Sequence, residues 1–278
     1  MIRSNFALAV LDSLKSQSVP ASVTDTMSEE ESDLSKKKSF WFDELSMPEA
    51  AQAAKDGKVV IIPCGSIEEH GDHLPLSTDS LQAEYVALGV AKKTGCLVAS
   101  PLRYGLCNST RNFPGTITIT FDSLRNIMTD ILEDFIRNGF KRLLVITGHA
   151  GGSHMTAIRL AAKAVVVKHM NEADRPRIMV CSDYDFAFDL RGIEFDDRDS
   201  HAGTIETSRV MAIRSDLIKG KGAPNFPNLP RFEVVPDPER CFPSGVMGDP
   251  TVASSEKGQK INEYVIEQIV KLVKELEQ

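Results

Sequence analysis

The stretch VVIIPCGSIEEHGDHLPLSTD, residues 59–79, decides the fold because it joins a buried strand to a helix through a loop of acidic residues and histidines. Its first seven residues form a short apolar run, rich in β-branched side chains, that closes on a glycine, as is typical of a strand buried on both faces. Two later runs have a similar character, RLLVITG (142–148) and RIMVCSD (177–183). We therefore expect three buried strands.

Helical patterns lie between and after these strands. Segments with recognisable helix ends run over 80–93 before Gly95, 123–137 before Gly139 and 153–169 after a Gly-Gly pair. Further helices are expected to start near 202–205 and to run over about 256–276. Strands separated by helices imply an α/β fold, with three α/β/α layers and a mostly parallel central sheet.

Two segments differ from this pattern. Residues 1–39 contain the polar run PASVTDTMSEEESDLSKKKS, which lacks periodic apolar positions and resembles a solvated extension. Residues 220–250 are rich in proline, which predicts an ordered but irregular excursion rather than a second domain. We place the domain boundary near Ser39, with an N-terminal extension (1–39) and one folded domain (40–278).

Composition excludes several classes of function. The chain has 278 residues, 42% of them hydrophobic, and a net charge of −7, so it can bury a full-sized core and offers no basic footprint for nucleic acid. The five cysteines are scattered and form no Cys-x-x-Cys pair, which is typical of reduced thiols in the cytoplasm. No apolar run is long enough for a membrane span. A small-molecule or peptide substrate is the expectation.

Metal-ligand residue types follow the first strand. Glu68 and His70 are two residues apart, which puts both side chains on one face of an extended segment, and Asp79 follows at the start of a helix. Two carboxylates and an imidazole suit zinc, manganese or iron rather than calcium or magnesium. The alternative is that Glu68 and His70 are solvated and that Asp79 caps the helix.

Two further segments add candidates. His149 in TGHAGGSH (147–154) lies just past the second strand, on a glycine-rich turn whose backbone N–H groups can face an anion. HAGTIETS (201–208) holds His201 and Glu206 near the start of the next helix. Each signal is weak alone, because such turns often contain glycine merely for packing and helix-surface carboxylates are usually solvated.

Taken together, these motifs resemble the creatininase (creatinine amidohydrolase) family. The likeness lies in five ordered motifs, PCGSIEEHGDHLPLSTD, FPGTITI (113–119), TGHAGG, HAGTIETS and SGVMGDPTVAS (244–254). It extends from about Trp41 to the last helix.

The resemblance implies a centre of two divalent ions (zinc, manganese or iron) in a homo-oligomer, for which a hexamer is common in the family. In that centre Asp79 bridges both ions, Glu68 and His149 complete one site, and His70 belongs to the other. The remaining carboxylate comes either from the second residue after His149, here Gly151, or from Glu206. His201 matches the position expected to pass a proton to the leaving nitrogen, and a shared carboxylate suits a two-metal hydrolase.

Departures from the family bear on the substrate. Ala150 and Gly151 replace the tyrosine and glutamate of true creatininases, and Thr110 and Gly152 replace a common histidine and asparagine. The only tryptophan, Trp41, precedes the metal loop, so the aromatic walls for a creatinine ring are missing. Creatinine is therefore not the expected substrate.

The leading hypothesis is an amidohydrolase that cleaves an amide, formamide or lactam C–N bond in a small polar metabolite. The resemblance also offers a formylaminopyrimidine nucleotide deformylase, a cofactor-precursor peptidase and a keto-inositol hydrolase. A phosphate-bearing ligand could use basic side chains, the candidates being Arg103, Arg111, Lys141 and Arg142. A hypothesis of another class is a non-catalytic protein that binds metal or ligand.

Overall fold

The computed structural model describes residues 39–278 except 231. The predicted extension, residues 1–39, therefore lies outside the described residues apart from Ser39. Residues 40–278 form one compact unit.

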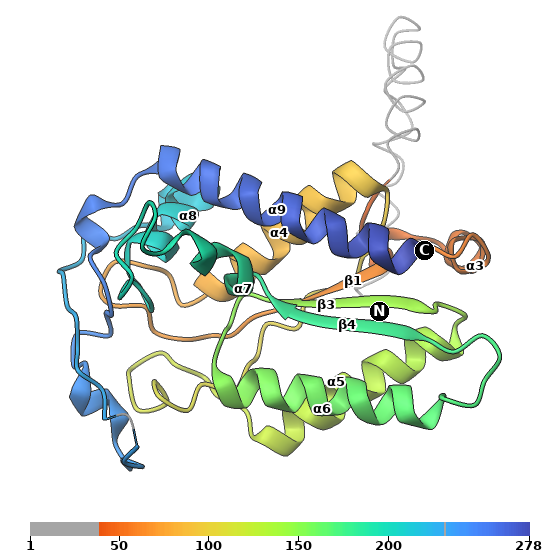
Figure 1. Ribbon diagram of the computed structural model, residues 1–278, viewed down its shortest axis with the longest axis horizontal. Helices are drawn as coiled ribbons and strands as arrows, with labels where there is room; N and C mark the ends of the chain where they lie inside the picture. The colour runs from red at the N-terminus through yellow and green to blue at the C-terminus, as the bar shows by residue number, and fades with distance from the viewer. Residues whose placement is uncertain (1–38, 231) are drawn as a thin grey trace, which may run out of the picture. The chain divides into compact units, whose positions relative to one another are not determined.

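A parallel sheet lies at the centre of this unit (Figure 1). Its strands in the described part of the chain are β1 (Val60–Cys64), β2 (Leu97–Val98), β3 (Arg142–Thr147) and β4 (Arg177–Ser182), in the order β2-β1-β3-β4. Every neighbouring pair is parallel. The three long strands are those predicted from their apolar runs, but only β1 and β3 are buried along their length, whereas β4 lies at the edge of the sheet and is exposed or half-buried up to Val180. β2 is an additional short strand.

Helices cover both faces of the sheet. One face carries α4 (Thr78–Thr94), α7 (Tyr184–Ala187), α8 (Thr204–Arg214) and α9 (Ser255–Glu277), and the other carries α5 (Phe121–Arg137) and α6 (Gly152–Lys168). Successive strand residues serve the two faces in turn, since Ile61 lies in the core with α4 and α9, whereas Ile62 lies in the core with α5 and α6. The three-layer α/β/α fold is confirmed.

The remaining elements are short. They are α3 (Met47–Lys55) and the 3₁₀ turns η1 (Phe42–Glu44), η2 (Phe188–Leu190), η3 (Ser215–Leu217), η4 (Pro238–Cys241) and η5 (Pro250–Val252). Between α8 and α9 the described residues contain no strand and only 3₁₀ turns, so the proline-rich excursion is irregular, as predicted. Among the described helices, none combines the length and apolarity that crossing a membrane requires.

The strand order creates a natural site at one edge of the sheet. From β1 the chain passes through α4 to β2 on one side, whereas β3 pairs with the other side of β1. The order thus reverses between β1 and β3, whose last residues, Cys64 and Thr147, lie opposite each other. Loops that leave neighbouring parallel strands at such a point form a crevice for ligands.

Candidate metal centre

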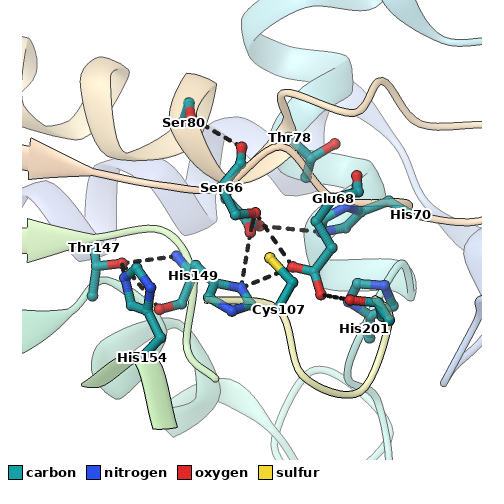
Figure 2. A network of polar contacts seen from close by, with 12 residues as sticks. Ser66, Glu68, His70, Thr78, Ser80, Cys107, Thr147, His149, His154 and His201 are labelled. Carbon is teal, nitrogen blue, oxygen red and sulfur yellow. Dashed lines mark hydrogen bonds and ion pairs between the residues drawn. The ribbon is translucent and has the colours of Figure 1, made fainter. Parts of the chain in front are cut away.

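Five predicted ligand residues meet at this crevice. Figure 2 labels Glu68, His70 and His149 among them. Glu68 and His70 come from the loop after β1, Asp79 from the first turn of α4, His149 from the loop after β3, and Glu206 from the first turn of α8. None of the five is more than 8% exposed. Carboxylates and imidazoles are costly to bury unless they pair with each other or bind a cation.

Asp79 lies between two histidines. Its Oδ1 atom is 3.1 Å from Nε2 of His70, and its Oδ2 atom is 3.0 Å from Nδ1 of His149. Ser66 donates a hydrogen bond of 2.5 Å to the same Oδ2 atom. Because each carboxylate oxygen faces a different imidazole, the side chain has the orientation of a bridge between two sites.

The first group of ligand atoms surrounds His149. Its Nδ1 atom is 2.8 Å from Oε2 of Glu68. Its Nε2 atom donates a hydrogen bond of 3.1 Å to the carbonyl oxygen of Leu106, which fixes the ring so that Nδ1 faces the carboxylates. Thr110 donates to Oε1 of Glu68 and so orients that carboxylate. A cation can replace the proton that Nδ1 shares with the carboxylates.

The second group surrounds His70. Its Nδ1 atom donates to the backbone oxygen of Glu68 at 3.1 Å, which leaves Nε2 facing Oδ1 of Asp79 and Oε2 of Glu206, the latter at 3.4 Å. Nε2 is buried and lacks a hydrogen-bond partner among the described residues. A buried nitrogen that points at two carboxylates without a hydrogen bond fits a metal ligand.

The start of α8 holds Glu206 in place. Asp199 accepts hydrogen bonds from the first two backbone N–H groups of the helix, Thr204 at 2.6 Å and Ile205 at 2.9 Å. Ala202 has a φ of 52°, in the left-handed region, and donates its N–H to Oε2 of Glu206 at 2.6 Å. The turn thereby aims the Glu206 carboxylate away from solvent and toward His70.

The electrostatic potential of the centre favours cations. Burial alone would lower the pKa of His70, but Asp79 and Glu206 outweigh that effect and raise it to about 10. Burial would raise the pKa of Asp79, yet His70 and His149 hold it well below its ordinary value. The Asp79 carboxylate is therefore ionised.

His201 lies at the edge of the centre, only partly exposed. Its Nε2 atom is 2.9 Å from the backbone oxygen of Glu69 and 3.1 Å from the Glu69 side chain, and its ring stacks on His70 at 4.3 Å between centroids. Burial and His70 lower the pKa of His201, but the hydrogen bond to Glu69 contributes to a net rise. His201 thus has a partner for its proton.

The donor atoms fit transition metals or zinc. Three groups each place their ligand atoms within 4.8 Å of one another, and their members are Glu68, His70 and His201; Glu68, Cys107 and His149; and His70, Asp79 and Glu206. Imidazole, carboxylate and thiol donors suit zinc, manganese or iron, whereas calcium and magnesium prefer oxygen donors alone.

The structure adds residues that sequence reasoning did not assign to the site. Ser66 and Thr110 orient the carboxylates, Glu69 pairs with His201, and Cys107 lies beside Glu68. Cys107 and Thr110 belong to the irregular segment before α5, whose path no hydrophobic period predicts. The only sequence signal for a role of Glu69 is its position between the candidate ligands Glu68 and His70.

Of the basic residues considered for a phosphate, Arg111 directly follows Thr110, which contacts Glu68, whereas the others have different surroundings. Lys141 and Arg142 lie at the start of β3, the opposite end of the strand from His149. Arg103 pairs with Glu84 at the surface. Trp41 lies beside Val98 of β2 and packs on the core shared with α4 and α9.

Comparison with known proteins identifies the family of the chain. A family model described as creatininase, creatinine amidohydrolase, matches residues 43–273. The chain is 29% identical over 256 residues to a creatinine amidohydrolase of Pseudomonas putida, covering 86% of this chain and 97% of the relative. It is 30% identical over 218 residues to a mycofactocin precursor peptide peptidase of Mycolicibacterium smegmatis, covering 73% of this chain and 79% of the relative.

Solved structures give the same result. A mutant creatininase described as the Zn-Zn type has a TM-score of 0.76 and 28% identity, covering 86% of this chain and 98% of that chain. A creatininase described with Mn has a TM-score of 0.75, with the same identity and coverage.

Proposed function

The chain belongs to the creatininase family of hydrolases, and we propose that it is a metal-dependent amidohydrolase for a small polar metabolite other than creatinine. The bond cleaved is an amide, formamide or lactam C–N bond. The observation that carries this proposal is the Asp79 carboxylate, whose two oxygens face two different buried histidines.

Each side chain has a role in the proposal. Glu68 and His149 would hold one ion, His70 and Glu206 would hold the other, and Asp79 would be a ligand of both. When bound, two such ions acidify a water molecule and polarise the substrate carbonyl. The metals named for the similar structures, zinc and manganese, both suit this donor set.

His201 is proposed to deliver a proton to the leaving nitrogen. An amine leaves poorly until it is protonated, so the reaction needs an acid at the edge of the centre. The Nε2 atom of His201 donates to Glu69, and this contact fixes the ring beside His70. The His201–Glu69 pair can hold the proton close to the proposed metal ligands.

Position 151 supports Glu206 as the remaining carboxylate ligand. A Cβ atom built on Gly151 would lie 2.6 Å from Nε2 of His149, whose ring is already held by Leu106. A side chain at 151 would therefore displace a ligand, whereas the Glu206 carboxylate already reaches His70.

Several features support a substrate that is small and is not creatinine. A pocket of about 200 Å³ next to the centre is lined by Glu69, Phe113, Pro243 and Ser244 among others. Trp41 packs elsewhere, so no tryptophan can stack on a planar ring there. The deformylase, peptidase and keto-inositol hydrolase activities remain alternatives within the same chemistry.

Assembly is a separate proposal. Val234 of the proline-rich excursion is 96% exposed, which supports contact with further copies of the chain in a homo-oligomer. Analytical ultracentrifugation tests this, and a monomer at micromolar concentration would contradict it.

Two variants test the roles in the centre. Glu206→Gln should weaken one metal site, so excess metal in the assay should restore part of the rate. His201→Asn should leave the metal content unchanged and lower turnover roughly 10²- to 10⁴-fold, the range for a lost general acid. Elemental analysis and a hydrolysis screen over amides, formamides and peptides provide the readings.

The outcomes separate the hypotheses. If His201→Asn lost metal and Glu206→Gln did not, His201 would be the metal ligand and Glu206 would not. Bound metal in the unaltered protein without hydrolysis of any C–N substrate would favour the non-catalytic binder.

A further inference from the structure

Cys107 lies against the metal centre although its sequence context does not mark it as a ligand. Its side chain is 1% exposed, and its Sγ atom lies within 4.8 Å of ligand atoms of both Glu68 and His149. Figure 2 shows the sulfur close to the side chains of Glu68 and His149. A buried thiol that only fills space would be expected among apolar neighbours.

The backbone on both sides of Cys107 is tied to the centre. The carbonyl of Leu106 accepts from Nε2 of His149 at 3.1 Å, and the Leu106 N–H donates to Nδ1 of His154 at 3.2 Å. The N–H of Cys107 donates to Oγ1 of Thr118 at 2.9 Å. The Leu106 carbonyl that orients His149 belongs to the peptide bond that leads into Cys107. The Cys107 sulfur and the His149 imidazole are therefore held in fixed positions relative to each other.

The two groups of ligand atoms differ once this sulfur is counted. His70, Asp79 and Glu206 supply three donors to one ion, and no described cysteine belongs to their group. Glu68, Asp79 and His149 also supply three donors, and the Cys107 sulfur is a further donor within 4.8 Å of the ligand atoms of Glu68 and His149. Four protein donors close a tetrahedral site, whereas three leave a position open for water or substrate.

We infer that Cys107 is a thiolate ligand that closes the Glu68–His149 site and leaves the His70–Glu206 site as the open one. This inference rests on the proposed function, because it needs a metal in the centre. A soft thiolate favours zinc over manganese, so the closed site should select zinc.

Ligation requires the thiol to lose its proton. Without a cation, burial and the Glu68 carboxylate raise the pKa of Cys107 to about 12, so the group is then a neutral thiol. A bound divalent ion reverses the local field and deprotonates a coordinating thiol outright. One sulfur–metal bond forms, one S–H bond breaks, and the proton passes to solvent.

Cobalt substitution tests the inference on the full chain. The metal-free protein is loaded with Co²⁺, and the near-ultraviolet sulfur-to-cobalt charge-transfer band is recorded. The expected result is a thiolate band in the unaltered protein that is absent from Cys107→Ser and Cys107→Ala. Cys107→Ser should also bind its first Zn²⁺ at least roughly 10- to 100-fold more weakly.

Cys96→Ala provides the matched control. Cys96 is also buried, at 2% exposure, but it precedes β2 at the opposite end of the sheet, so the band should persist in this variant. Stoichiometric Co²⁺ binding without a thiolate band would overturn the inference and leave the proposed function standing. A protein that binds no Co²⁺ would overturn both. The spectrum of the unaltered protein decides the matter even if a variant does not fold.

Discussion

Ionisable side chains cluster at both ends of the central sheet, but they are in contact with water at the amino end and buried at the carboxyl end. At the amino end a pocket of about 290 Å³ is lined by basic residues, namely Lys55, Lys141, Arg142, Arg175 and Arg177. Arg142 donates to the carbonyl of Gly57 just after α3, and Arg177 donates to the carbonyl of Leu276 in the last turn of α9. These cations compensate helix C-termini and remain in contact with water.

At the carboxyl end the charges are buried against one another. Carboxylates and histidines there are nearly inaccessible, and Nε2 of His70 has no hydrogen bond within the described residues. The two clusters are separated by the length of β3, roughly 17 Å for a six-residue strand. A cluster of charged side chains therefore indicates a binding site where its polar atoms are buried without hydrogen-bond partners among the described residues, as Nε2 of His70 is.

The largest effect is expected from Asp79→Ala, which attacks the carboxyl end directly. A carboxylate that faces both histidines serves two ions, so its loss should remove both metals and the hydrolytic activity. Elemental analysis of the purified variant measures this. Asp122→Ala is the control, because Asp122 also lies in the first turn of a helix but is exposed. Retention of two metal equivalents by Asp79→Ala would refute the bridge.

Arg209→Met tests the buried charges just beneath the centre. Arg209 donates to Asp183 at 2.5 Å and to Asn262 at 2.8 Å, and both members of the ion pair are fully buried. Removing the cation strands a buried carboxylate, so the free energy of unfolding should fall by about 3–5 kcal/mol. Urea unfolding measures the change. The double variant with Asp183→Leu should recover part of it, and a loss below about 1 kcal/mol would contradict the comparison.

The same substitution at the amino end, Arg142→Met, should lower the free energy of unfolding far less than Arg209→Met. Arg142 is only partly buried, and its hydrogen bond to Gly57 is 2.8 Å long. Losing it should lower the free energy of unfolding by about 1 kcal/mol and leave the metal content unchanged. If Arg142→Met were as destabilising as Arg209→Met, the contrast between the two ends would be wrong.

The smallest effect concerns pH. His169 ends α6 and contacts the carboxylates of Glu133 at 3.0 Å and Glu172, and these hydrogen bonds raise the pKa of His169 above its ordinary value of 6.5. A raised folded-state pKa contributes stability that is fully present below pH 6.5 and lost as the pH rises through the folded value. Thermal unfolding of His169→Gln across this range should show a loss of about 0.5 kcal/mol on the acidic side only.

The sequence predicted the elements whose apolar pattern is strong. The strands β1, β3 and β4 and the helices α4, α5, α6 and α9 lie within a few residues of their predicted bounds, because each has a continuous or periodic apolar pattern in its sequence. Among the elements that the sequence did not predict, α3 and β2 lack such an apolar face. In α3 no residue is fully buried, and β2 has two residues that are held by backbone hydrogen bonds to Val59 and Phe40.

The predictability of the site follows the same division. Glu68, His70 and His149 could be placed because the carboxyl ends of parallel strands meet at one edge. Glu206 and His201 required the family resemblance, since a helix-surface carboxylate carries no signal of its own. Cys107 and Thr110 could not be placed because the segment between β2 and α5 is irregular, and only the folded chain brings it to Glu68.

The order in which the chain supplies the ligands has a consequence for folding kinetics. The five side chains come from three segments that span residues 68 to 206, so the complete set exists only after β1, β3 and the start of α8 have docked. An interaction that forms after the transition state slows unfolding without speeding folding. Bound metal would therefore slow the unfolding of the folded protein. The folding rate would stay that of the metal-free chain.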